Sequence, residues 1–94
     1  MARRLGGTRE HHESRATGLS NSVVTTAGRA ATALSKGNCN KAFGLLSEAR
    51  EVSGMARAHF TEADHGGSVR RHVEYAQGYL ASVSETFSKK CVIR

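Results

Sequence analysis

Glycine marks two points at which the apolar periodicity of this chain breaks, and these breaks constrain the fold more than any other feature. Gly37 and the pair at 66–67 separate three segments in which apolar residues recur every three or four positions, the spacing that lines one face of a helix. Proline and tryptophan are absent and alanine is plentiful, which favours helix over strand. We therefore expect an all-α fold. The predicted helices cover about residues 21–36, 39–65 and 69–88.

The apolar stripes of neighbouring segments also match in register. If each glycine break is a short turn, residues that face each other across an antiparallel helix pair have numbers with a nearly constant sum. Leu34 then faces Ala42 across the first turn, and Phe60 faces Val73 across the second. Both registers hold along the full stripes, so the sequence predicts a small up-down-up three-helix bundle whose middle helix contacts both neighbours.

The two ends of the chain differ from this periodic body. Residues 1–18 are polar and without apolar period, so we predict an extended basic N-terminal arm, a bundle over 19–88 and a short basic C-terminal tail over 89–94. The net charge is +6, and most of it lies in the arm and tail. Basic ends of this kind contact nucleic acid or acidic protein surfaces, or are simply solvated. The predicted contacts are Arg3, Arg4, Arg9, Arg15, Lys89, Lys90 and Arg94.

The core material of the chain is scarce. Leu, Ile, Val and Phe together number 17 of the 94 residues, and thirteen alanines make up much of the remaining apolar content. Each alanine buries little area, so hydrophobic burial contributes only modest stability. We therefore expect support from other protein chains of an assembly or from self-association.

Two of the predicted helix surfaces carry few charges. The segment 21–36 contains Arg29 as its one internal charge, and the stretch "YLASVSETFS" at 79–88 is almost as bare. Exposed helices usually mix charges, whereas the centres of protein interfaces are depleted in them. Tyrosine and arginine dominate binding hot spots, although the two tyrosines could equally only flank the bundle core. The predicted partner-binding residues are Arg29, Arg70, Arg71, Tyr75 and Tyr79.

Histidines and carboxylates crowd the second turn. His59, Glu62 and His65 are spaced three apart, which suits a shared metal ion on a helix. In the bundle register, however, arginine lies opposite Glu62, and ion pairs across the hairpin satisfy these side chains more simply. The adjacent histidines of "EHHE" at 10–13 fall in the predicted arm, where neighbouring side chains diverge. We expect no metal and no cofactor.

The two cysteines are far apart in sequence, yet the bundle register places Cys39 and Cys91 at the same end. A disulfide is one alternative. Free thiols are the expectation, because the chain begins with no apolar secretory segment and cysteines outside oxidising compartments usually stay reduced. No apolar run approaches the roughly 20 residues that span a bilayer. We expect an intracellular or cytoplasmic protein, or a component within a virion or other large particle, with no membrane association.

No phosphate-binding loop, zinc-protease, serine-hydrolase or cysteine-pair zinc motif occurs in the sequence, and no catalytic residues are predicted. The leading hypothesis is a non-enzymatic structural or interaction subunit of a larger assembly, docking through low-charge helix faces and basic arms. A phage or virus particle and a ribonucleoprotein are settings that suit such a chain. The alternative is a small nucleic-acid-binding protein whose arginines and lysines neutralise phosphates without reading sequence.

Overall fold

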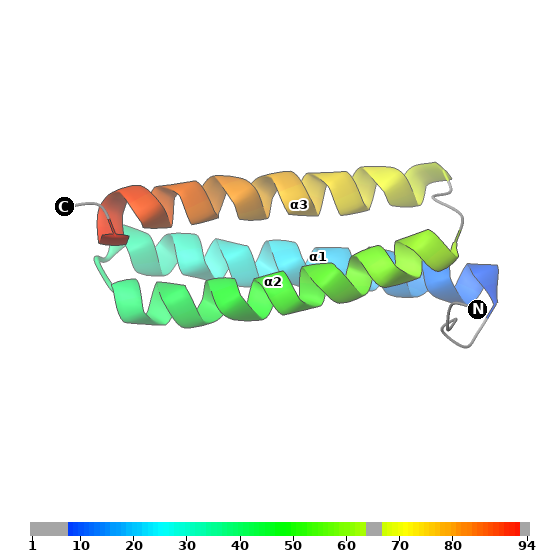
Figure 1. Cartoon of the computed structure of the whole chain (residues 1–94), viewed down its shortest axis with the longest axis horizontal. Coiled ribbons are helices and arrows are strands. Elements are labelled where there is room, and N and C mark those ends of the chain that lie inside the picture. The colour runs from blue at the N-terminus through cyan, green and yellow to red at the C-terminus, as the bar shows by residue number, and fades with distance from the viewer. Residues whose placement is uncertain (1–7, 64–66, 93–94) are drawn as a thin grey trace.

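The computed structural model describes residues 8–63 and 67–92 of the chain, and all the regular structure in these ranges is helical. The elements are α1 (Arg9–Ser35), α2 (Cys39–Glu62), α3 (Gly67–Phe87) and a short π-helix, η1 (Ser88–Val92). Helices α1 and α3 run in the same direction and α2 runs oppositely (Figure 1). The predicted all-α fold is confirmed, and the arrangement is that of an up-down-up three-helix bundle. None of the described helices is long and apolar enough to cross a bilayer.

Helix α1 begins at Arg9, not near residue 21, so the prediction of an extended arm is wrong for residues 9–18. The Thr8 hydroxyl caps the helix by accepting a hydrogen bond from the backbone N–H of His11 at 3.1 Å. His12, Ala16 and Leu19 are buried and continue the stripe to Val23. The period was missed because its first member is a histidine, which counts as polar in a hydropathy pattern. The remainder of the predicted arm, residues 1–7, lies outside the described residues.

The first turn forms at Gly37, as the sequence predicts. Gly37 has a φ of 75°, a left-handed conformation that costs side-chain-bearing residues free energy. The N–H groups of Gly37 and Asn38 donate to the carbonyls of Leu34 and Ala33 at 3.0 and 2.8 Å, which closes the C-terminal turn of α1. The Asn38 side chain then caps α2 by accepting from the Lys41 backbone N–H at 3.1 Å. The predicted break at Gly37 is confirmed.

The main hydrophobic core runs between the three helices and is built largely from alanine, with three leucines and two valines. Leu46 and Val23 are its largest fully buried apolar side chains. Leu34 and Ala42, predicted to face each other, belong to the same cluster. The buried members are Val23, Ala27, Ala30, Ala33, Leu34, Ala42, Leu46, Ala49, Ala76, Leu80 and Val83. Small side chains let the helix axes approach closely, so little apolar area suffices to fill the interior.

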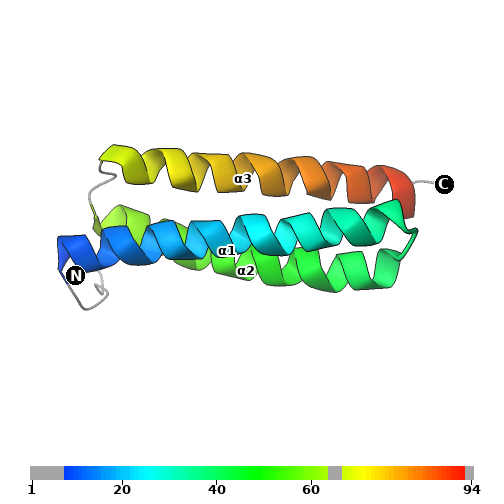
Figure 2. The same cartoon turned by 180° about the vertical axis from the view of Figure 1, so that it is seen from behind.

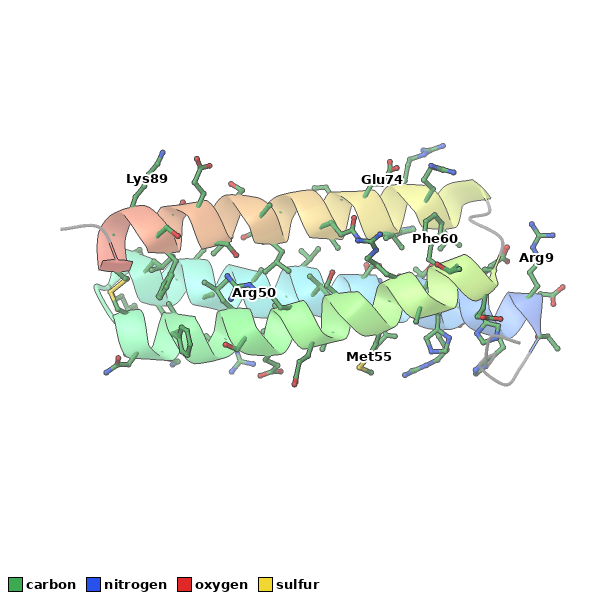
Figure 3. The ribbon with its side chains drawn as sticks, in the orientation of Figure 1. Arg9, Arg50, Met55, Phe60, Glu74 and Lys89 are labelled. Atoms are coloured by element: carbon green, nitrogen blue, oxygen red, sulfur yellow. A yellow bond between two sulfur atoms is a disulfide. The ribbon has the colours of Figure 1, made fainter. Side chains whose placement is uncertain are left out.

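A second, smaller cluster lies near the other end of the bundle. It contains Ala16, Phe60, Val69 and Val73, and so includes the predicted pair Phe60 and Val73. The Arg70 guanidinium lies 5.9 Å from the centroid of the Phe60 ring, and Figure 3 shows Phe60 directed from α2 toward α3. This end of the bundle is therefore held by four apolar residues and by polar contacts around them.

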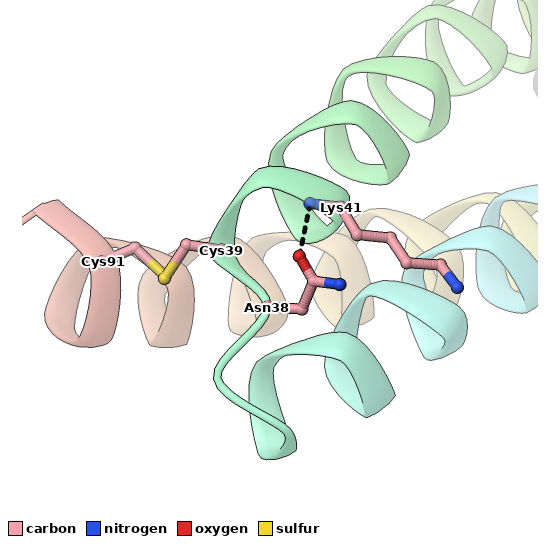
Figure 4. Close-up of a disulfide and its surroundings, with 4 residues drawn as sticks. All are labelled: Asn38, Cys39, Lys41 and Cys91. Atoms are coloured by element: carbon pink, nitrogen blue, oxygen red, sulfur yellow. Dashed lines mark hydrogen bonds between the residues drawn. A yellow bond between two sulfur atoms is a disulfide. The ribbon is translucent and has the colours of Figure 1, made fainter.

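A disulfide joins Cys39, the first residue of α2, to Cys91 in η1, with 5.8 Å between their Cα atoms (Figure 4). The predicted placement of both cysteines at one end is confirmed, but the expectation of free thiols is wrong. That expectation came from a rule about cellular compartments, whereas pairing depends on whether the two Cα atoms come within bonding range. The π-helical turn after Phe87 brings Cys91 to the start of α2.

Candidate functional site

The surface formed by α1 and α3 is nearly free of charge. Between Arg15 and Lys36 the only charged residue of α1 is Arg29, and α3 has none between Glu74 and Glu85. The two helices lie side by side in Figure 2, with α2 behind α1. The exposed uncharged residues on the side where these two helices meet define what we call the α1/α3 face: Gly18, Asn21 and Ser35 on α1, and Tyr75, Ser82 and Thr86 on α3. Uncharged, small and aromatic side chains of this kind are typical of interface centres.

The two tyrosines of α3 occupy different positions on this face. Their rings stack with centroids 6.3 Å apart. Tyr79 packs against the core cluster, and its hydroxyl lies 3.5 Å from where a Cβ on Gly28 would stand. Tyr75 is 64% exposed. Of the two roles considered from the sequence, Tyr79 has the position of a residue that flanks the core, and Tyr75 has the position of a free contact residue.

Two depressions lie along the seam between α1 and α3, and their charges differ. Glu10 and Glu13 line the first, a cavity of about 540 Å³ near the N-terminal ends of both helices. Lys90 lines the second, a cavity of about 260 Å³ next to Tyr79. The seam is thus acidic at one end, uncharged in its middle and basic at the other end.

The predicted partner-binding arginines do not gather on this face. Arg70 forms an ion pair with Glu74 at 3.6 Å in addition to its contact with Phe60, and Arg71 is exposed beside it. Arg29 lines a cavity between α1 and α2 instead. In contrast to the α1/α3 face, the outward side of α2 carries mixed charges around the exposed Met55 (Figure 3).

The end of the bundle that holds the disulfide is basic. The sequence contains no acidic residue from Ala16 to Ser47 and none after Glu85. Lys89 forms an ion pair with Glu85 at 3.7 Å, and Lys90 is exposed next to it. The other described cations of this end line a cavity of about 320 Å³ between α1 and α2: Arg29, Lys36 and Lys41. Lys36 and Lys41 are not among the contacts predicted from the sequence, although the absence of acidic residues around them indicates a basic surface.

The predicted nucleic-acid contacts are divided between the two ends. Lys89 and Lys90 lie at the disulfide end on η1. Arg9 and Arg15 lie in the first turns of α1 at the opposite end, where Arg9 forms an ion pair with Glu13 at 3.7 Å. The remaining predicted contacts, Arg3, Arg4 and Arg94, lie outside the described residues.

Three histidines meet at the end opposite the disulfide. His12 is only 2% exposed, and its Nδ1 lies 2.7 Å from Nδ1 of His59, so one N–H is shared between the two rings. The His11 ring lies edge-on to both, with centroid distances of 5.4 and 6.0 Å. The predicted divergence of the two adjacent histidines in an unstructured arm is therefore wrong, because both lie on helix α1 and contact α2.

The environment of His59 disfavours a positive charge. Burial lowers the pKa of His59 below its usual value, and the nearby His12, Arg15 and His11 lower it further, while Glu62 opposes them. Protonation of both rings would also point two N–H groups at each other across this hydrogen-bond distance. In the described part of the chain, Nε2 of the buried His12 has no hydrogen-bond partner. The hydrogen bond between the two rings is consequently lost when both carry a charge.

Within residues 8–63 and 67–92, no three histidine, cysteine or acidic side chains are arranged to hold a metal ion. His65, part of the spacing considered from the sequence, lies outside these ranges. Comparison of the chain with protein-family models, with curated proteins and with solved structures finds no match.

Proposed function

We propose that this protein is a non-enzymatic structural subunit that binds other protein chains through the α1/α3 face. The observation that carries the proposal is the charge-free middle of that face, which spans two parallel helices and exposes Tyr75. Burying a charged side chain at an interface costs free energy unless a partner compensates it. A surface without charges avoids that cost and is suited to association.

A second copy of the chain is the partner that this face fits. In an antiparallel two-fold dimer, Glu10 at one end of a seam meets Lys90 at the other end of the partner's seam, while Glu13 is already paired with Arg9. Association would also bury further apolar area, which benefits a chain with so alanine-rich a core.

Nucleic-acid binding is a second candidate, and the basic disulfide end favours it. Five described cations gather there, and only Lys89 has a described carboxylate partner. Positive charge without acidic neighbours attracts the phosphate backbone regardless of sequence. A groove-reading helix is not required for such contacts, so the expected binding weakens steeply as salt rises.

Light scattering on a charge-insertion variant tests the leading proposal. Ser82→Glu places a carboxylate on the α1/α3 face, and Ala58→Glu places the same charge on the exposed side of α2. The wild type and A58E are expected to self-associate, whereas S82E is expected to be monomeric, with the dimer weakened at least about tenfold. Circular dichroism checks that both variants remain helical.

Three results would decide against the proposal. A wild-type chain that stays monomeric up to millimolar concentration has no self-complementary face. Equal weakening by S82E and A58E would indicate general charge effects. A monomer that binds DNA or RNA tightly, with affinity falling steeply between two salt concentrations, would place the second candidate first.

A further inference from the structure

The cavity between α1 and α2 at the disulfide end has a lining unlike that of the rest of the surface. Its volume is about 320 Å³, and its polar lining consists of Arg29, Thr32, Lys36, Asn38 and Lys41. Three of these five side chains are cations and none is acidic. We propose that this cavity, the α1/α2 basic cavity, binds a phosphate group of a small anionic ligand.

The three cations of the cavity have no ion-pair partner among the residues that the structure describes. In the described ranges, the ion pairs are Arg9–Glu13, Arg70–Glu74 and Lys89–Glu85, and no described carboxylate pairs with Arg29, Lys36 or Lys41. Like charges that share one concave surface repel each other and raise the local concentration of counter-ions. A bound anion relieves this repulsion, whereas on an ordinary helix surface neighbouring acids already do so.

Of the two uncharged polar groups of the cavity, Asn38 adds donors for an anion and Thr32 does not. The Oδ1 atom of Asn38 is engaged as the cap of α2, since it accepts from the Lys41 backbone N–H, as Figure 4 shows. Its side-chain amide is left with N–H donors. The Thr32 hydroxyl donates to the Gly28 carbonyl at 3.2 Å and so keeps lone pairs rather than a second donor. The cavity therefore presents mainly donors, from Arg29, Lys36, Lys41 and Asn38.

This set of donors matches phosphate better than carboxylate. A guanidinium offers two parallel N–H groups to two oxygens of one anion, and each ammonium supplies a further charged donor. A phosphate monoester or diphosphate carries close to two or more negative charges and at least three acceptor oxygens, so it can engage all three cations at once. A carboxylate, with one charge and two oxygens, leaves one cation unpaired.

The loop that forms the cavity is fixed before any ligand arrives. Lys36 and Asn38 flank Gly37, whose conformation and hydrogen bonds close α1, and the next residue, Cys39, is held by the disulfide. Little conformational entropy is then lost on binding, which favours affinity in a small site. The site lies between α1 and α2, so it does not depend on self-association through the α1/α3 face.

Calorimetric titration of the full, oxidised chain with inorganic phosphate and with pyrophosphate, at constant ionic strength, tests the proposal. The informative variant is Lys36→Gln with Lys41→Gln, and the matched control is Lys89→Gln with Lys90→Gln, which removes the same charge from the same end. We expect saturable binding of pyrophosphate, weakened at least about tenfold in K36Q/K41Q and less than about twofold in K89Q/K90Q. The S82E variant is expected to bind like the wild type, which separates this site from the proposed dimer face.

Two outcomes would overturn the proposal. Equal weakening by both double variants would show that the ligand is attracted by the net charge of this end and has no defined site. An absence of saturable binding by the wild type would show that the cavity holds no phosphate. In a second readout, amide signals of Asn38 and Lys41 in NMR spectra should shift with pyrophosphate more than those of Lys89, and uniform shifts would contradict the assignment.

Discussion

The two ends of this bundle are held together by different physical means. At the disulfide end, a covalent bond, a glycine turn and an asparagine cap act beside a core cluster of eleven buried residues. At the histidine end, four buried apolar residues pack beside an imidazole pair that shares one N–H. Apolar packing and a disulfide are insensitive to mild changes of pH, whereas the imidazole pair depends on its protonation state. The stability of the disulfide end is therefore expected to be independent of mild pH changes, and that of the histidine end to depend on pH.

The two ends also differ in how well their charges are balanced. The histidine end pairs its arginines with glutamates, as in Arg9–Glu13 and Arg70–Glu74. The disulfide end leaves most of its cations without carboxylate partners among the described residues. Balanced charges at the surface contribute little net stability and attract few ligands. An unbalanced basic end repels itself, so its stability rests more heavily on the crosslink, and it is the end where anionic ligands are expected.

Removal of the disulfide is expected to produce the largest effect. Cys39→Ser with Cys91→Ser opens a link between residues 52 positions apart, and the chain-entropy model assigns about 4 kcal/mol of stability to closing such a loop. Urea unfolding with and without reductant measures this difference. Hydrogen exchange should accelerate first in the early turns of α2, near Cys39, while the amides near His59 change less. Equal unfolding midpoints with and without reductant would contradict the conclusion that the disulfide stabilises this end.

Truncation of the two core clusters should give the next largest difference. Leu46 is fully buried in the main cluster, so Leu46→Ala is expected to lower the free energy of unfolding by about 3 kcal/mol. Val73→Ala removes fewer methyl groups from the smaller cluster and should cost about 1.5 kcal/mol. Urea titration at pH 7.5 compares them. A loss from V73A as large as that from L46A would mean that the histidine end is packed as firmly as the other.

Acidification should weaken the histidine end selectively. The pKa of His59 in the folded protein is lower than its ordinary value of 6.5. As the pH falls below that value, the unfolded chain therefore binds more protons than the folded chain. The stability that neutral His59 contributes is fully present above its ordinary pKa. It is lost as the pH falls from there toward the lower pKa of the folded protein. We expect the midpoint temperature of unfolding to be lower at pH 5 than at pH 7.5. This decrease should be smaller than the decrease that Leu46→Ala causes.

Two histidine variants identify the source of that pH dependence. His12→Leu replaces the buried imidazole with an apolar group and should make the pH profile shallower, because the lowering of the pKa of His59 by His12 is removed while the lowering by burial remains. His72→Gln removes an exposed histidine from α3 and should leave the profile unchanged. If H72Q and H12L flatten it equally, the buried pair is not responsible.

Loss of the helix caps is expected to give the smallest effect. Asn38→Ala removes the cap of α2 and should cost about 1 kcal/mol, the usual value for such a change. Thr8→Ala removes the corresponding cap of α1 at the histidine end and should cost only a few tenths, since the first turn of α1 can fray without disturbing the main core. Urea unfolding of the two variants, with hydrogen exchange near His11, measures both. Equal losses would show that α1 unfolds cooperatively from its first turn.

Local features of the sequence were sufficient to predict how many helices form and how their apolar stripes align. Gly37, the Asn38 cap and the apolar stripes that include Leu34, Ala42 and Leu46 act within a few residues of chain. Such signals are legible because helix periodicity and turn conformation are set by neighbours in sequence. The start of α1 was missed because the residue that continues its stripe is a histidine, and a polar residue becomes a core residue only when a partner is present to satisfy it.

The sequence by itself determined that this chain forms three helices, where two of them end, and which apolar residues share the core. Only the tertiary structure decided that His12 is buried against His59, 47 residues away, that Cys39 bonds to Cys91, and that Lys36 and Lys41 line one cavity with Arg29. The physical reason is that periodicity specifies which face of a helix is buried, whereas pairings between distant polar side chains depend on the exact distances at which the helices pack.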